Sequence, residues 1–430
     1  KIFDEALENG KAYSWLDYLA NNIGGRLSGS PQAAQAVKWS ETIFKSMPVT
    51  VIKQQCMVPH WVRGPKEKAF IIEGSKKTEV PVNAIGHSIA TPKEGLTAEV
   101  IEVKSWDELK TLGEKNMLKD KIVFYNFKWN QKNIRTFHSY GDAVGPRAGG
   151  AAKAAPYGAI GVVIRSAGSS LDDYPHTGWM GYNDTIKKIP ACAISTNAAE
   201  LLSRKLMIKT AGPVKFSFTQ LCEMLPDTPS FNVIGEIKGS EFPDEIILVG
   251  GHLDSWDTGH GAHDDGAGVV QSMEVLSLFL KLGIKPKRTI RAVLFMNEEN
   301  GGRGGAKYAE LAKQNNEKNI AAIESDAGGF TPHGFGFSGD SAKVEKLLQW
   351  SALFSDYGLW NWDKNGGGAD IGHLNGQGTV LIGLHPDSQR YFDYHHTAQD
   401  TFDKVNRREL ELGAASMAGL VYLMSEYGVK

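Results

Sequence analysis

The chain has 430 residues, and its 47 Lys and Arg against 49 Asp and Glu give a formal net charge of −2. This balance argues against a non-specific nucleic-acid binder, and 41% hydrophobic with 22% charged residues excludes disordered, collagen-like and coiled-coil chains. At about 150 residues per domain, the length predicts two to three domains. No apolar run approaches the roughly 18 residues that cross a bilayer, so we expect no integral membrane segment.

The N-terminal part of the chain, up to about residue 62, is predicted to be helical. Apolar residues recur there at helical spacing, and a second helix is expected from Pro31, after the turn-rich segment GGRLSGS. Residues 66–224 instead contain short apolar runs such as AEVIEV, KIVFYNF and AIGVVIRS, separated by Gly, Pro or Asn. These runs predict a mostly β module. The PDTPS segment at residues 226–230 is expected to be a hinge.

After the expected hinge the pattern changes to that of an α/β domain. The runs EIILVGG, TIRAVLFM and NIAAIES predict three buried parallel strands. A helix is expected after Asp265, because Val269, Met273, Leu276 and Leu280 form one apolar stripe. Acids or a histidine follow each strand directly, at the edge of the sheet where ligands of open α/β folds bind.

Two motifs follow the first of these strands. In GGHLDS, His252 comes directly after the strand, and Asp254 is placed to accept the second ring proton of a metal-bound imidazole. In GAHDDGAG, the adjacent charges of Asp264 and Asp265 repel unless something positive lies between them. Each motif alone also has an ordinary explanation, either a hydrogen-bonded histidine at a strand end or an aspartate that caps a helix.

The next two strands end in acidic motifs as well. Glu298 and Glu299 end the second strand, and neighbouring side chains on an extended segment point in opposite directions. One glutamate is therefore placed to bind a metal while the other faces a substrate or water. Asp326, in ESDAGG, follows the third strand. A solvated acidic loop explains either motif when it is taken alone.

A later motif, DYHHTAQDT, adds imidazole groups. His395 and His396 offer nitrogen ligands, and Asp400 is placed to orient one of them. Taken together, carboxylates and imidazoles after three successive strands and in one later loop make the ligand set of a hydrolytic zinc pair.

The order of these motifs resembles a known family. HLDS, GAHDDGAG, NEENGG, ESDAGG and HHTAQDT follow one another as in the M28 zinc metallopeptidases, which include bacterial leucyl aminopeptidases and glutamate carboxypeptidases. SGSPQ, YPHTGWMGY, IPACAIS and KPKRTIRAVLF extend the similarity to the carboxypeptidase Q group of that family, over about residues 27–401. The resemblance implies a doubly wound mixed sheet with helices on both faces for residues 1–65 and 225–430. It also implies an inserted, mostly β protease-associated domain for residues 66–224.

The resemblance further implies two divalent metal ions, expected to be zinc. Their ligands are expected to be His252, Asp264, Glu299, Asp326 and His396. In this pattern His252 and Asp326 bind one ion, Glu299 and His396 bind the other, and Asp264 bridges the two.

Other residues receive roles from the same resemblance. Glu298 is expected to be the general base that takes a proton from water, and Asp254 the acid that supports His252. Asp370, in GGGADIGH, is expected near the substrate. His176 lies in YPHTG at residues 174–178, and we expect this segment to limit the length of the substrate.

The expected substrates are short peptides, with dipeptides foremost. A broader aminopeptidase, a single-zinc enzyme like the glutaminyl cyclases, a non-catalytic relative and a sugar- or lipid-binding module stay open as alternatives. The resemblance also suggests a homodimer and an exported enzyme whose signal peptide has been removed. No nucleic-acid partner is expected.

Overall fold

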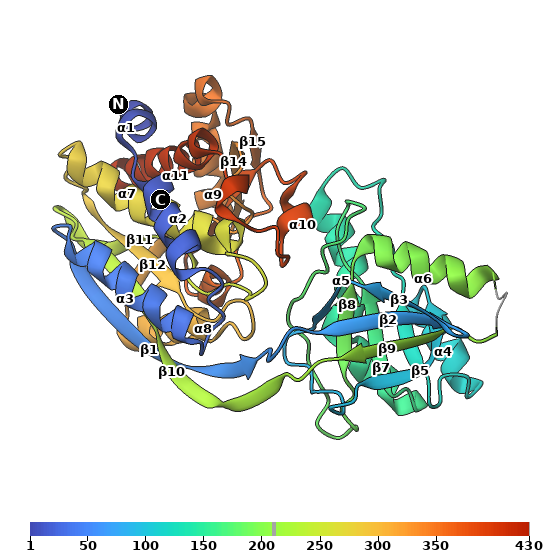
Figure 1. Ribbon diagram of the computed structural model, residues 1–430. Coiled ribbons are helices and arrows are strands. Elements are labelled where there is room, and N and C mark those ends of the chain that lie inside the picture. The colour runs from blue at the N-terminus through green and yellow to red at the C-terminus, as the bar shows by residue number, and fades with distance from the viewer. Residues whose placement is uncertain (209–211, 430) are drawn as a thin grey trace. The chain divides into compact units, whose positions relative to one another are not determined.

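The computed structural model describes residues 1–208 and 212–429. These residues form two compact units, each with its own eight-stranded sheet (Figure 1). Unit 1 contains Lys1–Pro59, Asp227–Tyr391 and Asp400–Lys430, and unit 2 contains His60–Pro226 and Phe392–Gln399. The assignment of a peptidase domain to residues 1–65 and 225–430 and of a protease-associated domain to residues 66–224 stays a prediction.

Unit 1 contains helices and strands, and two of its strands, Thr50–Val62 and Glu223–Ile237, have end residues that belong to unit 2. Its elements are α1 (Ile2–Asn9), α2 (Ala12–Asp17), η1 (Tyr18–Ile23), α3 (Pro31–Lys45), β1 (Thr50–Val62), β10 (Glu223–Ile237), β11 (Phe242–His252), η3 (Ala262–Gly266), α7 (Ala267–Lys281), β12 (Arg288–Phe295), α8 (Arg303–Gln314), β13 (Lys318–Glu324), β14 (Pro332–Ser338), α9 (Ser341–Leu348), η4 (Gln349–Tyr357), β15 (Asn361–Asp363), η5 (Ile371–Leu374), β16 (Val380–Pro386), η6 (Phe402–Lys404) and α11 (Arg407–Tyr427).

The sheet of unit 1 is mixed, as expected, with the strand order β1-β10-β12-β11-β13-β16-β14-β15. The three strands predicted to be buried and parallel, β11, β12 and β13, are neighbours and run parallel. In this register His252 pairs with Phe295, and Gly250 pairs with Glu324. The residues that follow the three strands therefore emerge at one edge of the sheet.

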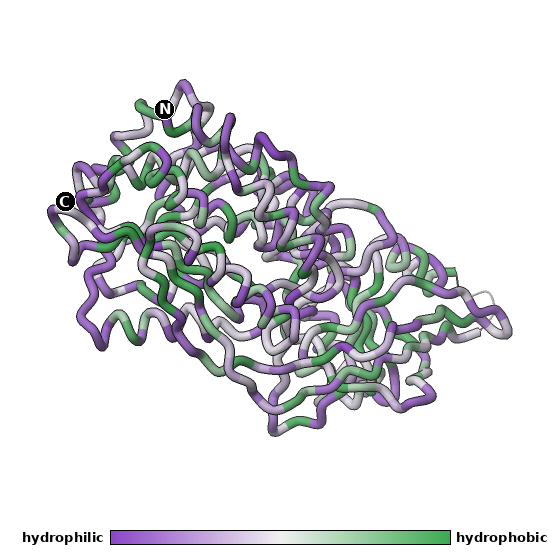
Figure 2. Tube along the Cα trace, turned by 60° about the vertical axis from the view of Figure 1, so that its left-hand side comes forward, coloured by the Kyte–Doolittle hydropathy of each residue, from purple (hydrophilic) through white to green (hydrophobic). Residues whose placement is uncertain are grey.

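Helices cover both faces of this sheet, as expected. Ile247 and Val249 of β11 belong to the core cluster that includes α7 and α11, whereas Leu248 belongs to the cluster that includes α8 and η5. Successive side chains of a strand point to opposite faces, so a strand between two helical layers reads as a continuous apolar run. In Figure 2 hydrophobic segments lie mainly inside the trace and hydrophilic ones mainly along its periphery.

The helical prediction for the N-terminal part is right as far as α3 and wrong after it. The Ser30 side chain caps α3 by accepting a hydrogen bond from the backbone N–H of Ala33 at 3.1 Å, and Pro31 occupies the first helical position. Thr50–Val62 form strand β1 at the edge of the sheet instead of a helix. Its β-branched residues fit a half-buried strand that pairs with β10.

The expected hinge at residues 226–230 lies inside strand β10, and the boundary between the two units falls within it, between Pro226 and Asp227. Proline has no N–H to donate to a sheet. The ladder between β10 and β12 runs from Val233 to Ile237, so Pro226 and Pro229 precede it. The two prolines thus mark a strand segment outside that ladder and not a turn.

Unit 2 is a mixed α/β structure. Its elements are β2 (Lys68–Glu73), β3 (Lys76–Val80), β4 (Val82–Ala84), β5 (Leu96–Val103), α4 (Trp106–Glu114), β6 (Ile122–Tyr125), α5 (Thr136–Ala154), η2 (Ala155–Tyr157), β7 (Gly161–Arg165), β8 (Ala191–Ile194), α6 (Thr196–Ile208), β9 (Lys215–Thr219) and α10 (Tyr391–Tyr394), whose first residue belongs to unit 1.

The apolar runs predicted to be strands in unit 2 are strands, in the order β3-β2-β9-β5-β6-β7-β8-β4. The expectation of a mostly β module is wrong, because α4, α5 and α6 accompany the sheet. The sequence does not predict α5, because this helix contains glycines and Pro146, which have low helix propensity. A Cβ at Gly150 would come within 2.8 Å of the Tyr125 ring, so the glycine permits close packing that propensity alone does not predict.

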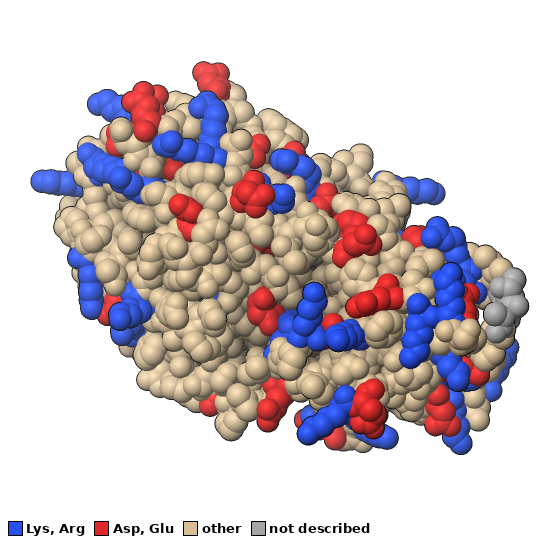
Figure 3. Space-filling view, viewed as in Figure 1, with Lys and Arg blue, Asp and Glu red and all other residues tan. Residues whose placement is uncertain are grey.

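Charge and hydropathy of the surface are ordinary. Acidic and basic side chains are interspersed on the face shown in Figure 3, in keeping with the net charge of −2. Among the helices that the structure describes, none is both long and apolar enough to cross a membrane.

Candidate metal centre

His252 ends β11 and directs its two ring nitrogens at different partners. Nδ1 lies 3.0 Å from the backbone carbonyl of Asp254, which makes Nδ1 the donor and leaves the lone pair on Nε2. Nε2 lies 3.1 Å from Asp264 Oδ1, 3.5 Å from Asp326 Oδ1 and 4.0 Å from Glu298 Oε2. A lone pair that faces carboxylates requires a positive charge between them.

The electrostatics of His252 agree with that geometry. Burial lowers the pKa of its imidazole, but the charge of Asp326 and the hydrogen bond with Asp264 raise it by more. The net pKa lies well above the ordinary value for histidine. The cluster thus favours a cation at Nε2, which is either a proton or a metal ion.

The turn η3 gives its two adjacent aspartates different tasks. Asp265 uses both carboxylate oxygens locally, because they accept hydrogen bonds from the backbone N–H groups of His252 at 3.0 Å and Gly268 at 2.9 Å. Asp264 instead directs Oδ1 at the His252 ring. Asp264 is therefore the better metal ligand, and Asp265 holds the turn against the end of β11.

Asp400 was expected to orient a histidine, but the structure gives it another task. Its Oδ1 accepts hydrogen bonds from the backbone N–H groups of Ala262 at 3.1 Å and His263 at 2.7 Å, and Oδ2 accepts one from Asp264 at 3.1 Å. Burial raises the pKa of Asp400 to about 7. Asp400 thus fixes the backbone of η3, a role that its position in the sequence does not reveal.

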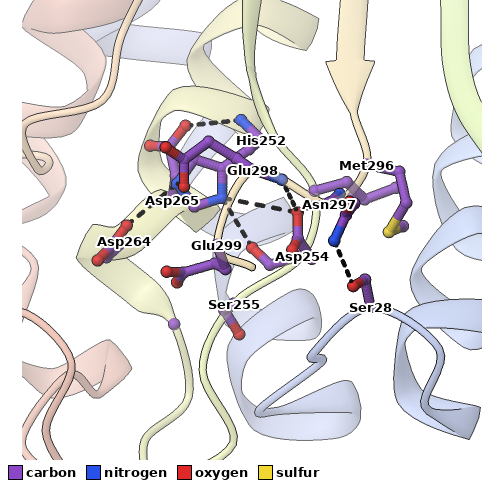
Figure 4. A network of polar contacts seen from close by, with 12 residues as sticks. Ser28, His252, Asp254, Ser255, Asp264, Asp265, Met296, Asn297, Glu298 and Glu299 are labelled. Carbon is purple, nitrogen blue, oxygen red and sulfur yellow. Dashed lines mark hydrogen bonds and ion pairs between the residues drawn. The ribbon is translucent and has the colours of Figure 1, made fainter. Parts of the chain in front are cut away.

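The backbone carbonyl of Asp254 contacts the His252 ring, and its side chain contacts the turn after β12 (Figure 4). Its carboxylate lies 3.9 Å from Nδ1 of His252, beyond hydrogen-bonding distance. Its Oδ1 accepts hydrogen bonds from the backbone N–H groups of Asn297 at 2.7 Å and Glu298 at 3.1 Å. The side chain of Asp254 therefore anchors the turn after β12, and the expected support of the imidazole by this carboxylate stays a prediction.

Glu298 and Glu299 follow β12 in that turn. Oε1 of Glu299 accepts a hydrogen bond from the backbone N–H of Trp256 at 3.1 Å. The side chain of Glu298 remains 24% exposed. Burial and the neighbouring carboxylates, opposed by His252, raise the pKa of Glu298 well above its ordinary value. Glu298 is therefore suited to holding a proton near neutral pH.

Four of the five expected metal ligands come together in unit 1. Ligand atoms of His252, Asp264 and Glu299 all lie within 4.8 Å of one another, and so do those of His252, Asp265 and Asp326. In the second group both oxygens of Asp265 accept backbone hydrogen bonds, and Asp326 Oδ1 lies 3.5 Å from Nε2 of His252. Imidazole with carboxylates is a donor set that fits zinc.

Glu324 and Asp370 form a second layer of carboxylates in unit 1. The Glu324 carboxylate accepts hydrogen bonds from the backbone N–H groups of Asp370 at 3.1 Å and Ile371 at 2.8 Å, and burial raises its pKa to about 7. Both oxygens of Asp370 are buried without a hydrogen-bond partner among the described residues. Burial, then the charges of Glu324 and Glu298, raise the pKa of Asp370 well above normal. The expected contact of Asp370 with substrate stays a prediction.

The motif pattern does not single out Glu324, although the sequence contains a signal for it. It is the first letter of ESDAGG and the last residue of a buried apolar strand, where an acid requires partners.

The two remaining expected residues, His396 and His176, lie in unit 2. The backbone N–H of Thr177 donates to the carbonyl of His396 at 3.0 Å, and Nδ1 of His396 lies 3.2 Å from the carbonyl of Thr177. His176 is buried, and its backbone N–H donates to Ser166 Oγ at 2.8 Å. Burial lowers the pKa of His176 to about 3. The YPHTG segment thus holds His396, whereas metal binding by His396 and substrate selection by His176 stay predictions.

Comparison with known proteins gives consistent matches over nearly the whole chain. Residues 232–421 match the pattern of peptidase family M28. Carboxypeptidase Q of Mus musculus is 35% identical over 417 residues, which cover 97% of this chain and 86% of that protein. Carboxypeptidase Q of Bos taurus is 36% identical over 420 residues, which cover 97% and 85%.

Solved structures agree with these matches. The crystal structure of a peptidase M28 precursor from Shewanella amazonensis SB2B superimposes with a TM-score of 0.93 at 36% identity, covering 99% of this chain and 95% of that one. The zinc aminopeptidase BSAP of Bacillus subtilis gives a TM-score of 0.69 at 18% identity, covering 97% and 95%. The second likeness concerns the fold alone.

Proposed function

Because the chain belongs to peptidase family M28, we propose that it is a zinc-dependent exopeptidase that hydrolyses short peptides, with dipeptides foremost. One observation carries the proposal. Nε2 of His252 faces Asp264 and Asp326 while Nδ1 donates to a backbone carbonyl, which is the arrangement of a histidine prepared to bind a metal. The similarity to carboxypeptidase Q over 97% of the chain supports the same conclusion.

We propose two zinc ions with Asp264 as the shared ligand. His252 and Asp326 would hold one ion, and Glu299 and His396 would hold the other. Support for four of these ligands comes from their short mutual distances in unit 1. The assignment of His396 rests on the order of the motifs and on the family resemblance.

Zinc in such a site polarises the scissile carbonyl and lowers the pKa of a water molecule. In the proposed reaction the oxygen of the attacking water bonds to the carbonyl carbon, and Glu298 accepts a proton from this water. Glu298 then returns this proton to the amine nitrogen as the C–N bond breaks. The raised pKa of Glu298 suits both transfers, and the hydrogen bond from its backbone N–H to Asp254 fixes the turn that presents it.

The test is a panel of dipeptides with free ends, a blocked N-terminus or a blocked C-terminus, assayed with chelator and after zinc is returned. We expect hydrolysis of free dipeptides, loss of activity with chelator, recovery with zinc, and two zinc ions per chain. Equal cleavage of long and C-terminally blocked peptides would identify a broader aminopeptidase. One zinc per chain with cyclisation of N-terminal glutamine would identify a cyclase-like enzyme. Zinc-independent cleavage would overturn the proposal.

We also propose that the enzyme is exported, on the strength of the family resemblance. Cell fractionation of the full-length gene product in its native host tests this proposal. Enzyme that stays in the cytosolic fraction would contradict it.

A further inference from the structure

The segment of residues 24–30, GGRLSGS, joins η1 to α3 in unit 1 and contains none of the residues assigned to the reaction. Nevertheless, it contains two deeply buried polar side chains, since Arg26 is 0% exposed and Ser28 is 1% exposed. A charged or polar side chain tolerates such burial only when it has hydrogen-bond partners. Those partners lie on the two loops that carry the metal-binding carboxylates.

Arg26 binds the loop that connects β11 to η3. Nε donates to the carbonyl of Leu253 at 2.6 Å, Nη1 to that of His260 at 2.9 Å, and Nη2 to that of Gly261 at 3.0 Å. Leu253 directly follows the metal-binding histidine, and Gly261 directly precedes η3. One planar guanidinium group therefore fixes both ends of this loop.

The backbone of the segment approaches the same loop closely. The backbone N–H of Arg26 donates to Ser255 Oγ at 3.2 Å, and the backbone N–H of Ser255 lies 3.4 Å from the carbonyl of Arg26. A Cβ at Gly25 would lie 2.9 Å from Cα of Asp257 and from the carbonyl oxygen of Gly259. Glycine at position 25 thus permits the contact that brings the Arg26 side chain to its three carbonyls.

Ser28 binds the second loop, the turn after β12 (Figure 4). Its hydroxyl donates to Asn300 Oδ1 at 2.7 Å and accepts a hydrogen bond from Asn297 Nδ2 at 2.8 Å. Asn297 has a φ of +76°, a conformation that asparagine tolerates better than most residues. Glu298 and Glu299 come next, so Ser28 braces the turn that directs both carboxylates.

Arg26 also faces the negative charge of the centre. Asp400, Asp254, Asp265 and Glu299 act electrostatically on its guanidinium group, although its described hydrogen-bond acceptors are all backbone carbonyls. Two physical roles are therefore distinguishable, namely a geometric one through the three hydrogen bonds to the β11–η3 loop and an electrostatic one through the charge. The number and planarity of the hydrogen bonds favour the geometric role.

We propose that Arg26 and Ser28 are positioning residues of the metal centre. Arg26 holds the β11–η3 loop and Ser28 holds the turn after β12, so that one short segment sets the spacing between the carboxylates of the two loops. This inference rests on the proposed function. Substitution of a residue that orients metal ligands lowers metal affinity or activity by about 10–100-fold. The expected effect is therefore large enough to measure.

The first experiment compares Arg26→Lys and Arg26→Met with Arg408→Lys and Arg408→Met, which alter an exposed arginine on α11. Zinc affinity is measured on the full chain by competition with a chromogenic chelator, alongside kcat and KM for a cleaved dipeptide. We expect both Arg26 variants to lose about 10–100-fold in zinc affinity and in kcat with little change in KM, because lysine cannot donate to three carbonyls in a plane. An Arg26→Lys variant with wild-type zinc affinity would overturn the geometric role.

Ser28→Ala provides the second experiment and keeps the proposal testable if the Arg26 variants do not fold. Its matched control is Ser341→Ala, at an exposed position in α9. We expect about a 10-fold loss of zinc affinity and kcat for Ser28→Ala and none for the control. A lower melting temperature with unchanged zinc affinity would reduce Ser28 to a purely structural role and overturn the proposal.

The wild-type protein separates the two levels of the argument. A wild-type protein without zinc-dependent hydrolysis would overturn the proposed function itself. An active wild type whose Arg26 and Ser28 variants behave like the controls would overturn only this inference.

Discussion

Glu298 and Glu299 are neighbours in the chain, but their surroundings predict different consequences when each is changed. Glu298→Gln keeps the shape of the side chain and removes its ability to accept a proton. We expect kcat to fall by about 100-fold or more with unchanged zinc content. Glu299→Gln is the comparison, since Glu299, His252 and Asp264 place ligand atoms within 4.8 Å of one another and are proposed metal ligands. This second variant should lose zinc as well as activity.

Steady-state kinetics and zinc analysis of the two purified variants check this prediction. A Glu298→Gln variant that turns over dipeptides at nearly the wild-type rate would show that another group accepts the proton.

Asp400 supports a prediction about stability. Its two oxygens accept three backbone hydrogen bonds from η3, and an amide nitrogen in place of one oxygen would face an N–H group. We expect Asp400→Asn to lower the free energy of unfolding by about 1–3 kcal/mol, the cost of a buried unsatisfied donor. Denaturant unfolding measures the loss, with Asp356→Asn at an exposed position as the control. Equal unfolding free energies for the two variants would contradict this role.

At the scale of single residues, the sequence predicts which carboxylates and imidazole come together in unit 1 better than it predicts the residues that support them. His252 ends β11 and Asp326 comes shortly after β13, a parallel neighbour of β11, so the pattern of strand and polar residue is enough to predict that these two lie close together. Arg26 donates to carbonyls and Asp400 accepts from N–H groups, and every residue except proline carries both of those backbone groups. Hydrogen bonds from a side chain to distant backbone leave no signature in the sequence.

At the scale of helices and strands, the start of α2 is held by two buried carboxylates. The backbone N–H of Lys11 donates to Glu274 of α7 and that of Tyr13 donates to Glu411 of α11, both at 3.1 Å. Burial and, to a smaller extent, the charge of Glu411 raise the pKa of Glu274, whereas the charge of Lys281 lowers it. The net pKa of Glu274 is about 8. The folded state therefore keeps a proton on Glu274 over a pH range in which the unfolded chain has lost it.

This difference predicts a pH-dependent stability. The unfolded chain releases the proton of Glu274 near pH 4.5 and the folded chain near pH 8, so this residue makes the fold less stable as the pH rises between the two values. Glu274→Gln removes the ionisation, and its unfolding free energy relative to wild type should therefore rise from pH 5 to pH 8. Denaturant unfolding at several pH values measures the difference, with Glu8→Gln at an exposed position as the control. A difference that is constant with pH would exclude this ionisation as the cause.

The elements that the sequence predicts well are those in which one face or both are buried. β11 lies between two helical layers and reads as an unbroken apolar run, and α7 carries a clear apolar stripe. The sequence of β1 does not predict a strand, because an edge strand with mixed burial has little periodicity. The sequence of α5 does not predict a helix, because its glycines, which lie close to Tyr125 and Trp106, are typical of loops.

At the scale of the whole molecule, the two units have separate hydrophobic cores. The cores of unit 1 surround its sheet with α7, α11 and α8, and those of unit 2 include β6 together with α5 and α6. A ligand that binds only the folded state stabilises it by RT ln(1 + [L]/Kd), or about 2.7 kcal/mol at 100 times Kd. Because four of the five proposed ligands lie in unit 1, zinc should stabilise that unit directly.

Hydrogen exchange read by mass spectrometry, with zinc and with chelator, tests this distribution. We expect zinc to slow exchange in peptides from the end of β11, from η3 and from the turn after β12, because the metal would hold these segments together. β6 in the core of unit 2 should exchange equally in both conditions. Slower exchange of β6 without any change at the end of β11 would contradict a metal centre built on unit 1.

The segment of residues 392–399 provides the decisive comparison in the same experiment, because it belongs to unit 2 and contains the proposed ligand His396. Two hydrogen bonds with Thr177 hold His396 within unit 2. Additional protection of this segment by zinc is therefore expected only if His396 binds the metal. If the ends of the unit 1 strands gain protection while residues 392–399 do not, the second ion takes its imidazole from another residue, and His396→Ala should then leave the zinc content at two ions per chain.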